Sequence, residues 1–308
     1  MVIGIDVETD VGSWTPYYQG VEKGIPTLLD IFQRQKVKAT FFFTGDVADK
    51  FPKSTRPVLK SGHEVGCHTL YHETVGDELF PIPGVKPLLS EEIPLRLKKA
   101  TELVEKAAGV KPISFRAPRL WGSTAMVNAL EKLGYKADAS YPLYFYRKRL
   151  FPYHPSRKNW LEEGKNRVLE IPNFADISQK SNDPFGRDLD QWPTFRTEGA
   201  KVLMRKVRNF VNYVTPSPNL SPTLMVGNPP QGRGKKRKEP VICFYFHPWE
   251  FVPMAKRFHY GEGTVIPDYF CVKNCGPKAA QELERLIISL KKEYSAQFLT
   301  AEGLADIW

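Results

Sequence analysis

Short apolar segments alternate with amphipathic segments along most of this 308-residue chain. The apolar segments have the length and composition of buried strands, and the amphipathic ones repeat apolar residues at helical spacing. Repeated strand-then-helix units favour a parallel sheet covered by helices, because parallel strands need long crossover connections. The pattern predicts strands at 2–7, 39–44, 64–68, 112–116, 168–172, 241–246 and 297–300, and helices at 24–35, 93–107, 124–133, 197–213 and 277–294.

Seven or eight such units predict an α/β fold, a distorted (β/α)7-8 barrel of the TIM type, formed as a single domain over residues 1–308. In a barrel of this type the chemistry lies at the carboxyl ends of the strands. A doubly wound open sheet is the alternative, but it would need a Gly-rich phosphate-binding turn after the first strand. The acidic segment 6–10 stands there instead.

One segment, at about 215–240, interrupts this alternation. It contains six prolines and the basic run Lys235–Lys238, which predicts a flexible surface insertion. A binding arm for a polyanion is the alternative interpretation of the same residues.

The net charge of +10 is spread along the chain rather than gathered in a stripe with interleaved aromatic residues, so no nucleic-acid partner is expected. No apolar run is long enough to span a membrane, and no signal peptide is visible, so we expect a cytoplasmic protein. The sequence leaves self-association as a homo-oligomer open.

Four cysteines are too few for the disulfide framework of a small secreted domain. Cys271 and Cys275 form a C-x3-C pair that lacks two further ligands for a structural zinc site. Free thiols, a local disulfide and a catalytic role remain open for this pair. Cys67 precedes a histidine of interest, but it is expected to be buried and inert.

Acidic residues end the first predicted strand. Residues two apart on a strand point to the same face, so a barrel would aim Asp6 and Glu8 together at its mouth. A buried charge needs a partner. A nearby metal ion would satisfy this pair of carboxylates.

Two histidines follow the third predicted strand. His68 and His72 are four residues apart, and a helical turn would place both rings on one face in a common geometry for zinc. A pair of unrelated surface histidines is the alternative, which the acidic cluster of the first strand makes less favourable.

Three further polar residues stand at predicted strand ends. Arg116 would face the acidic cluster and orient a carboxylate. Asp138 would hold Arg116 or a histidine, or it is a turn residue. His247 follows an apolar strand and precedes a proline, where it is either a positioned general acid or a satisfied core histidine. The aromatic residues expected to line a substrate pocket are Trp14, Trp121, Tyr141 and Trp249.

In their order along the chain, these motifs resemble the polysaccharide deacetylase family, also called carbohydrate esterase family 4 or the NodB homology domain. The segments His68-Thr69-Leu70-Tyr71-His72 and His247-Pro248 carry the most specific part of the resemblance. The spaced acids Asp6-Val7-Glu8 resemble a subgroup with a D-x-[DE] first motif, which includes peptidoglycan deacetylase-like and allantoinase-like proteins. The third motif departs from the common pattern, since Leu120 stands where an aromatic residue is usual.

The resemblance implies a role for each matching residue. Glu8, His68 and His72 would bind Zn²⁺ or another divalent metal. Asp6 would be the general base, oriented by Arg116, and His247 the general acid. A backbone N–H near Trp121 would stabilise the oxyanion.

The resemblance also implies a metal-dependent hydrolase that removes acetyl groups from N-acetylated amino sugars, either free or in a glycan. A cyclic amide or imide hydrolase on the same fold is the first alternative, and a small closed pocket would favour it. A catalytically silent carbohydrate-binding protein is the second.

Overall fold

The computed structural model describes residues 1–215 and 239–308 of the chain. The predicted insertion at about 215–240 therefore lies almost entirely outside the described residues. No helix in the described ranges is long and apolar enough to cross a membrane.

The core of the fold is a parallel sheet of seven strands in the order β6-β5-β4-β3-β2-β1-β7. The strands are β1 (Val2–Val7), β2 (Thr40–Phe43), β3 (Glu64–Cys67), β4 (Ser114–Phe115), β5 (Ala137–Asp138), β6 (Leu169–Glu170) and β7 (Cys243–Phe246). A single parallel bridge between Asn173 and Cys243 joins the two edges of the sheet. The sheet therefore curls into a (β/α)7 barrel, which confirms the predicted fold class.

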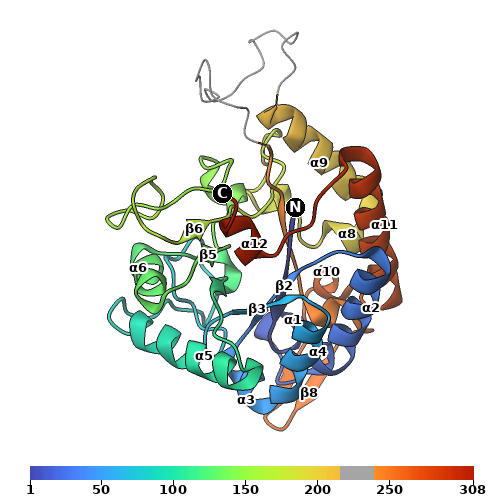
Figure 1. Ribbon diagram of the computed structural model, residues 1–308. Coiled ribbons are helices and arrows are strands. Elements are labelled where there is room, and N and C mark those ends of the chain that lie inside the picture. Colours follow the sequence, from blue (N-terminus) through green and yellow to red (C-terminus); the bar gives the residue numbers. More distant parts are fainter. Residues whose placement is uncertain (216–238) are drawn as a thin grey trace.

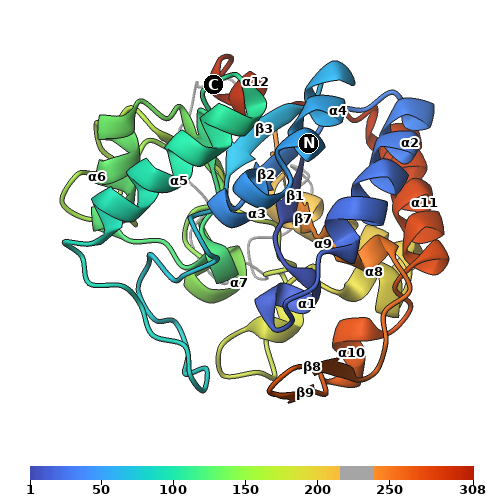
Figure 2. The same cartoon turned by 90° about the horizontal axis from the view of Figure 1, so that it is seen from below.

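Helices surround the strands in both views (Figures 1 and 2). The α-helices are α1 (Asp10–Ser13), α2 (Ile25–Gln35), α3 (Gly45–Lys50), α4 (Thr55–Lys60), α5 (Ile93–Ala108), α6 (Thr124–Leu133), α7 (Leu143–Tyr146), α8 (Thr194–Thr197), α9 (Ala200–Val214), α10 (Tyr269–Val272), α11 (Pro277–Tyr294) and α12 (Ala301–Ala305). Short 3-10 or π segments are η1 (Gly20–Gly24), η2 (Pro52–Ser54), η3 (Pro118–Leu120), η4 (Arg187–Leu189) and η6 (Pro248–Phe251). An antiparallel hairpin of β8 (Phe258–Tyr260) and β9 (Gly263–Val265) lies apart from the barrel sheet.

Strand alternation divides the apolar residues between two cores. On β2, Phe41 and Phe43 pack with the surrounding helices, whereas Phe42 belongs to the cluster inside the barrel. Ala301 and Leu304 of α12 join that inner cluster, so α12 packs against the barrel interior. The inner core is small, which leaves room for polar side chains at the other end of the barrel.

The predicted strand at 297–300 is wrong. The structure has one parallel bridge there, between Val2 and Leu299, and a hydrogen bond of 3.0 Å from the Leu299 amide to the Met1 carbonyl oxygen. The ring already closes through Asn173 and Cys243, so the terminal segment has no open sheet edge on which to extend its pairing.

The buried His63 predicts a pH-dependent loss of stability. The Ala39 amide donates to its Nδ1 at 3.2 Å, and burial, reinforced by the charge of Lys38, lowers the pKa of His63 from 6.5 to about 4. The unfolded chain therefore binds more protons than the folded one between these values, and the free energy of unfolding falls as the pH drops through this window. His63→Asn should show a smaller fall in urea titrations between pH 6.5 and 4.5. Equal pH slopes for the two proteins would contradict this.

Candidate active site

The first strand carries its polar residues into the barrel. Asp6 and Glu8 alternate with the apolar residues of β1 that face the helices, and both carboxylates are buried. Asp10 is different, because its two carboxylate oxygens accept the amides of Gln19 and Gly20, each at 2.9 Å. Asp10 therefore fixes the chain after β1, while the other two acids remain available to a site.

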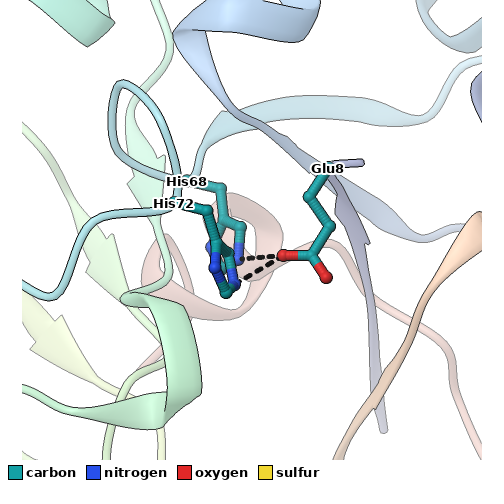
Figure 3. Close-up of side chains that lie close together, drawn as sticks. All are labelled: Glu8, His68 and His72. Atoms are coloured by element: carbon teal, nitrogen blue, oxygen red, sulfur yellow. Dashed lines mark ion pairs between the residues drawn. The ribbon is translucent and has the colours of Figure 1, made fainter. Parts of the chain in front are cut away.

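Glu8 meets two imidazoles beyond the end of β3 (Figure 3). Its Oε2 lies 2.5 Å from Nε2 of His72 and 3.5 Å from Nε2 of His68. Nδ1 of His68 lies 2.7 Å from the carbonyl oxygen of Arg116, which orients that ring. One buried carboxylate and two ring nitrogens thus converge from two strand ends.

The prediction of a helical turn between His68 and His72 is wrong. Residues 68–72 form no helix, and both Thr69 and His72 have positive φ angles, of 64° and 60°. The amides of Gly45 and Asp46 donate to the carbonyl oxygens of Thr69 and Leu70, each at 2.9 Å. The start of α3, rather than a helical repeat, therefore holds this loop.

The three side chains fit a divalent metal ion. One ligand atom from each of Glu8, His68 and His72 lies within 4.8 Å of the others. Both carboxylate oxygens of Glu8 are buried, and their ion-pair partners in the described ranges are the imidazoles of His68, His72 and His247. A buried carboxylate whose neighbours carry no permanent positive charge is costly unless a cation completes its surroundings.

The protonation states agree with this fit. Burial opposes ionisation of Glu8, but the charge of His72 and the contacts of both imidazoles outweigh it and hold the pKa of Glu8 well below its usual range. Burial lowers the pKa of His72, against the opposing charge of Glu8. An ionised Glu8 beside a His72 that loses its proton readily suits Zn²⁺, which binds carboxylates and neutral imidazoles.

Arg116 is buried inside the barrel and reaches Asp6. Its Nη1 donates to Oδ1 of Asp6 at 2.8 Å, and its Nε donates to the Ala139 carbonyl oxygen at 3.0 Å. The guanidinium lies over the ring of Phe42, 4.6 Å from its centroid. A Cβ atom at Gly4 would lie 2.0 Å from Nη1, so the glycine on β1 makes room for this arginine. Arg116 thus lies in the position from which it was predicted to orient Asp6.

His247 follows β7 and lies near the carboxylate oxygen of Glu8 that the other two histidines do not contact. Its Nε2 is 4.0 Å from Oε1 of Glu8, and its Nδ1 is 3.2 Å from Oε2 of Glu250. Burial alone would lower the pKa of His247, but the hydrogen bond and charge of Glu250, with Glu8 and Asp6, raise it. Glu250 is itself held by Arg196 at 2.7 Å and by Nε1 of Trp192 at 2.9 Å. His247 is therefore a positioned and readily protonated imidazole.

These groups open onto one cavity of about 180 Å³. Its lining residues are Asp6, Glu8, Val11, Gly12, Trp14, His68, His72, Phe80, Ile82, Arg119, Leu120, Arg187, Trp192, Tyr245, His247, Trp249 and Cys271. The metal-ligating candidates, Asp6 and His247 therefore share a single pocket.

The structure separates the four aromatic candidates into two groups. Trp14 and Trp249 line the cavity, but Trp121 and Tyr141 do not, and both are fully buried. The Trp121 ring packs edge-on against Phe80, while Tyr141 packs against Trp160 and accepts two loop amides through its hydroxyl. Trp121 therefore packs behind a residue that lines the cavity, and Tyr141 is a core residue.

Two other predictions, the oxyanion-binding N–H near Trp121 and the contacts of Asp138, do not match the structure. The amides of Leu120 and Trp121 donate to the carbonyl oxygens of Ala117 and Pro118, each at 3.1 Å, so both are engaged within the turn. Asp138 does not line the cavity and has no hydrogen bond with Arg116 or a histidine in the described ranges. It accepts the Ser140 hydroxyl, and burial raises its pKa to about 6.

Sequence reasoning missed several lining residues. Arg119, Arg187 and Trp192 come from turns with no repeating hydrophobic pattern, so nothing in their spacing marked them. Arg119 directly follows the Arg116-Ala117-Pro118 motif, and that position was the one available signal. Cys271 also lines the cavity; it and Cys275 are unbonded thiols, and burial raises the pKa of Cys271 to about 11. Cys67 is fully buried, and burial raises its pKa to about 12.

The fold and the site together define a parallel α/β barrel with a candidate metal centre of one carboxylate and two histidines. Residues 13–137 match the family model for polysaccharide deacetylase. This segment of the chain is thus similar to the polysaccharide deacetylase family. The matched range includes both histidines and Arg116, and it begins after Asp6 and Glu8.

Curated relatives match part of the chain, and solved structures share its fold. The peptidoglycan-N-acetylglucosamine deacetylase of Bacillus cereus is 28% identical over 133 residues, which cover 35% of this chain and 45% of the relative. The chain spans about half the length of the curated relatives that it matches. A probable polysaccharide deacetylase from Pseudomonas aeruginosa superposes with a TM-score of 0.60 at 14% identity, covering 100% of this chain and 89% of that one. The Puue allantoinase superposes with a TM-score of 0.59 at 13% identity, with the same coverage.

Proposed function

We infer that this protein, as one domain, is a metal-dependent hydrolase that removes acetyl groups from N-acetylated amino sugars. One observation carries the proposal: Glu8, His68 and His72 converge at the same pocket as Asp6 and His247. The match to the family model and the deacetylase named among the relatives support the amide as the bond that is cleaved.

The chain's own residues divide the work of amide hydrolysis. A divalent ion held by Glu8, His68 and His72 would polarise the acetyl carbonyl group and acidify the attacking water. Asp6, fixed through Oδ1 by Arg116, takes the proton of that water as it attacks. His247, protonated and held by Glu250, gives a proton to the nitrogen that leaves. Trp14 and Trp249 stand where they can pack against a sugar ring.

The proposal is tested by metal analysis and then by assays for acetate release. The purified protein should contain or bind one divalent ion, and it should release acetate from N-acetylglucosamine or its oligomers. Chelation should abolish this activity, and Zn²⁺ should restore it. A metal-loaded protein that releases no acetate from any of these sugars would exclude the proposed function.

The size of the cavity favours a second candidate, a cyclic amide or imide hydrolase. About 180 Å³ is below the usual range of about 300 to 1,000 Å³ for small-molecule pockets, so the enclosed part holds roughly one ring. Ring opening of a cyclic imide uses the same base, acid and ligand set. Hydantoin or succinimide should be included in the assays, and turnover of these compounds without acetate release from sugars would select this candidate.

Metal binding predicts a large stabilisation that is independent of activity. Zn²⁺ at 100 times its dissociation constant should raise the free energy of unfolding by about 2.7 kcal/mol, because it binds the folded site. Glu8→Gln should lose most of the resulting shift in Tm, since the substitution removes an ionised ligand. His154→Gln is the matched control, because His154 does not line the cavity. An unchanged zinc-induced shift in Glu8→Gln would remove Glu8 from the ligand set.

The assignment of His247 as the general acid predicts how kcat falls on the alkaline side of the pH–rate profile. A general acid works only when protonated, so kcat should fall as the pH rises through the raised pKa of His247. Glu250→Gln removes the charge that raises this pKa and should move the fall in kcat to lower pH. The substitution Glu198→Gln, at an exposed residue, is the control. Thermal melts of Glu250→Gln check that the variant still folds, because Arg196 loses its partner there. Identical profiles would contradict the assignment.

A further inference from the structure

Arg119 is a cation of the pocket that the proposed chemistry does not use. It belongs to the turn η3, has a φ angle of 59°, and lines the same cavity as the metal-ligating candidates. A non-glycine residue with positive φ is uncommon and persists where the surroundings hold it. The turn therefore fixes the direction in which this long side chain enters the pocket.

The guanidinium of Arg119 has few partners. All its hydrogen bonds come from Nη1, and all are long: 3.3 Å to the carbonyl oxygen of His72, 3.4 Å to Nδ1 of His72 and 3.5 Å to Oγ1 of Thr74. No carboxylate in the described ranges forms an ion pair with it, and neither Nε nor Nη2 has a hydrogen-bond partner there. Burial lowers the pKa of Arg119, and only the more distant charge of Glu8 opposes this.

One of these contacts would be weakened if His72 bound a metal. Nε2 of His72 faces Glu8, so the ring would offer this nitrogen to a metal and carry its proton on Nδ1. Nδ1 would then be a donor facing another donor, Nη1 of Arg119. A metal would also neutralise Glu8, the charge that now balances Arg119. With a metal bound, Arg119 would therefore lack a counter-charge among the described residues.

The other charged groups around the pocket are already paired. Asp6 binds Arg116 at 2.8 Å, and the Glu250 carboxylate lies 3.2 Å from His247. Arg187 lies 3.8 Å from Asp190 and donates to the hydroxyl of Tyr144 at 3.1 Å. Among the charged residues of the described lining, Arg119 is thus the cation left for a ligand.

We propose that Arg119 binds a carboxylate of the substrate, so that the preferred substrate is an N-acetylated amino sugar that carries an acid group. The inference rests on the proposed function and narrows its substrate class. A guanidinium presents its free Nε and Nη2 donors as a planar fork that matches the two oxygens of a carboxylate. Placed beside the ligand set, such a fork fixes the acetamido group relative to Asp6 and His247.

Three sugars of closely similar structure test the proposal. N-acetylmuramic acid carries a lactyl carboxylate, its methyl ester removes the charge and adds only one methyl group, and N-acetylglucosamine lacks the lactyl group. The protein should show a kcat/KM about 10- to 100-fold higher for the acid than for the ester. Arg119→Gln should lower kcat/KM more for the acid than for the ester, so that this preference disappears, and Arg119→Lys should keep part of it. The exposed Arg56→Gln on α4 is the matched control.

The outcomes separate this inference from the proposed function. Equal rates on acid and ester, or an equal loss on both in Arg119→Gln, would overturn the role of Arg119 even if acetate is released. If no sugar is hydrolysed, the proposed function fails, and calorimetric titration of the zinc-loaded protein decides the inference. Tighter binding of the acid than of the ester, lost in Arg119→Gln, would support it; no binding of the acid, or unchanged binding in Arg119→Gln, would overturn it. Thermal melts with and without Zn²⁺ show whether the Arg119 variants keep the folded site.

Discussion

Asp6→Asn is expected to lower kcat by about 10²- to 10⁴-fold while zinc binding is retained. The amide of asparagine has nearly the same shape as the carboxylate, but it cannot accept the proton of the attacking water. Asp6 lines the cavity, and the only hydrogen bond of its carboxylate in the described ranges is the one that Oδ1 accepts from Arg116. It is not one of the three residues whose ligand atoms cluster. The loss should therefore appear in kcat rather than in the metal content.

The measurement combines steady-state kinetics with metal analysis of the same preparations. Asp30→Asn, an exposed substitution on α2, makes the same chemical change away from the pocket. Zinc stoichiometry near that of the unchanged protein, together with a collapsed kcat, supports Asp6 as the base. A variant that keeps its kcat would show that another group takes the proton, and a variant that loses its metal would place Asp6 among the ligands.

The regular elements could be predicted because their signals are local. The strand 2–7 and the helices 124–133 and 277–294 have the predicted bounds, and Ser123 and Gly134 cap the first of these helices. Apolar spacing and capping chemistry are written into adjacent residues, so one sequence suffices to find them.

Parts of the candidate site also followed from local reasoning. Parallel strands end at one edge of a barrel, so residues just beyond Val7, Cys67 and Phe115 had to come near one another. The loop conformation of 68–72 could not be predicted, because the start of α3 holds it through contacts that are distant in sequence. The residues of the pocket wall could not be predicted either. Phe80 and Trp192 come from long connections, which have no periodic pattern.

The buried Arg116 explains why a glycine stands in the middle of β1. Strand interiors disfavour glycine, which gives up packing and conformational entropy there. At Gly4 any side chain would collide with the guanidinium, because a Cβ atom would lie 2.0 Å from Nη1 and 2.4 Å from Nη2. Because Gly4 has no side chain, the guanidinium of Arg116 can reach Asp6 through the interior of the barrel.

Arg116→Met is consequently expected to lower the free energy of unfolding by about 3 to 5 kcal/mol, the usual effect of removing one partner of a buried ion pair. Methionine fills similar space and packs over Phe42, but it leaves the Asp6 carboxylate buried without its counter-charge. In an Asp6→Asn background the same substitution should cost much less, because no buried anion remains. Urea unfolding of the four proteins of this cycle gives the coupling energy. Equal losses in both backgrounds would mean that Arg116 stabilises the barrel through its packing and its bond to the Ala139 carbonyl oxygen rather than through Asp6.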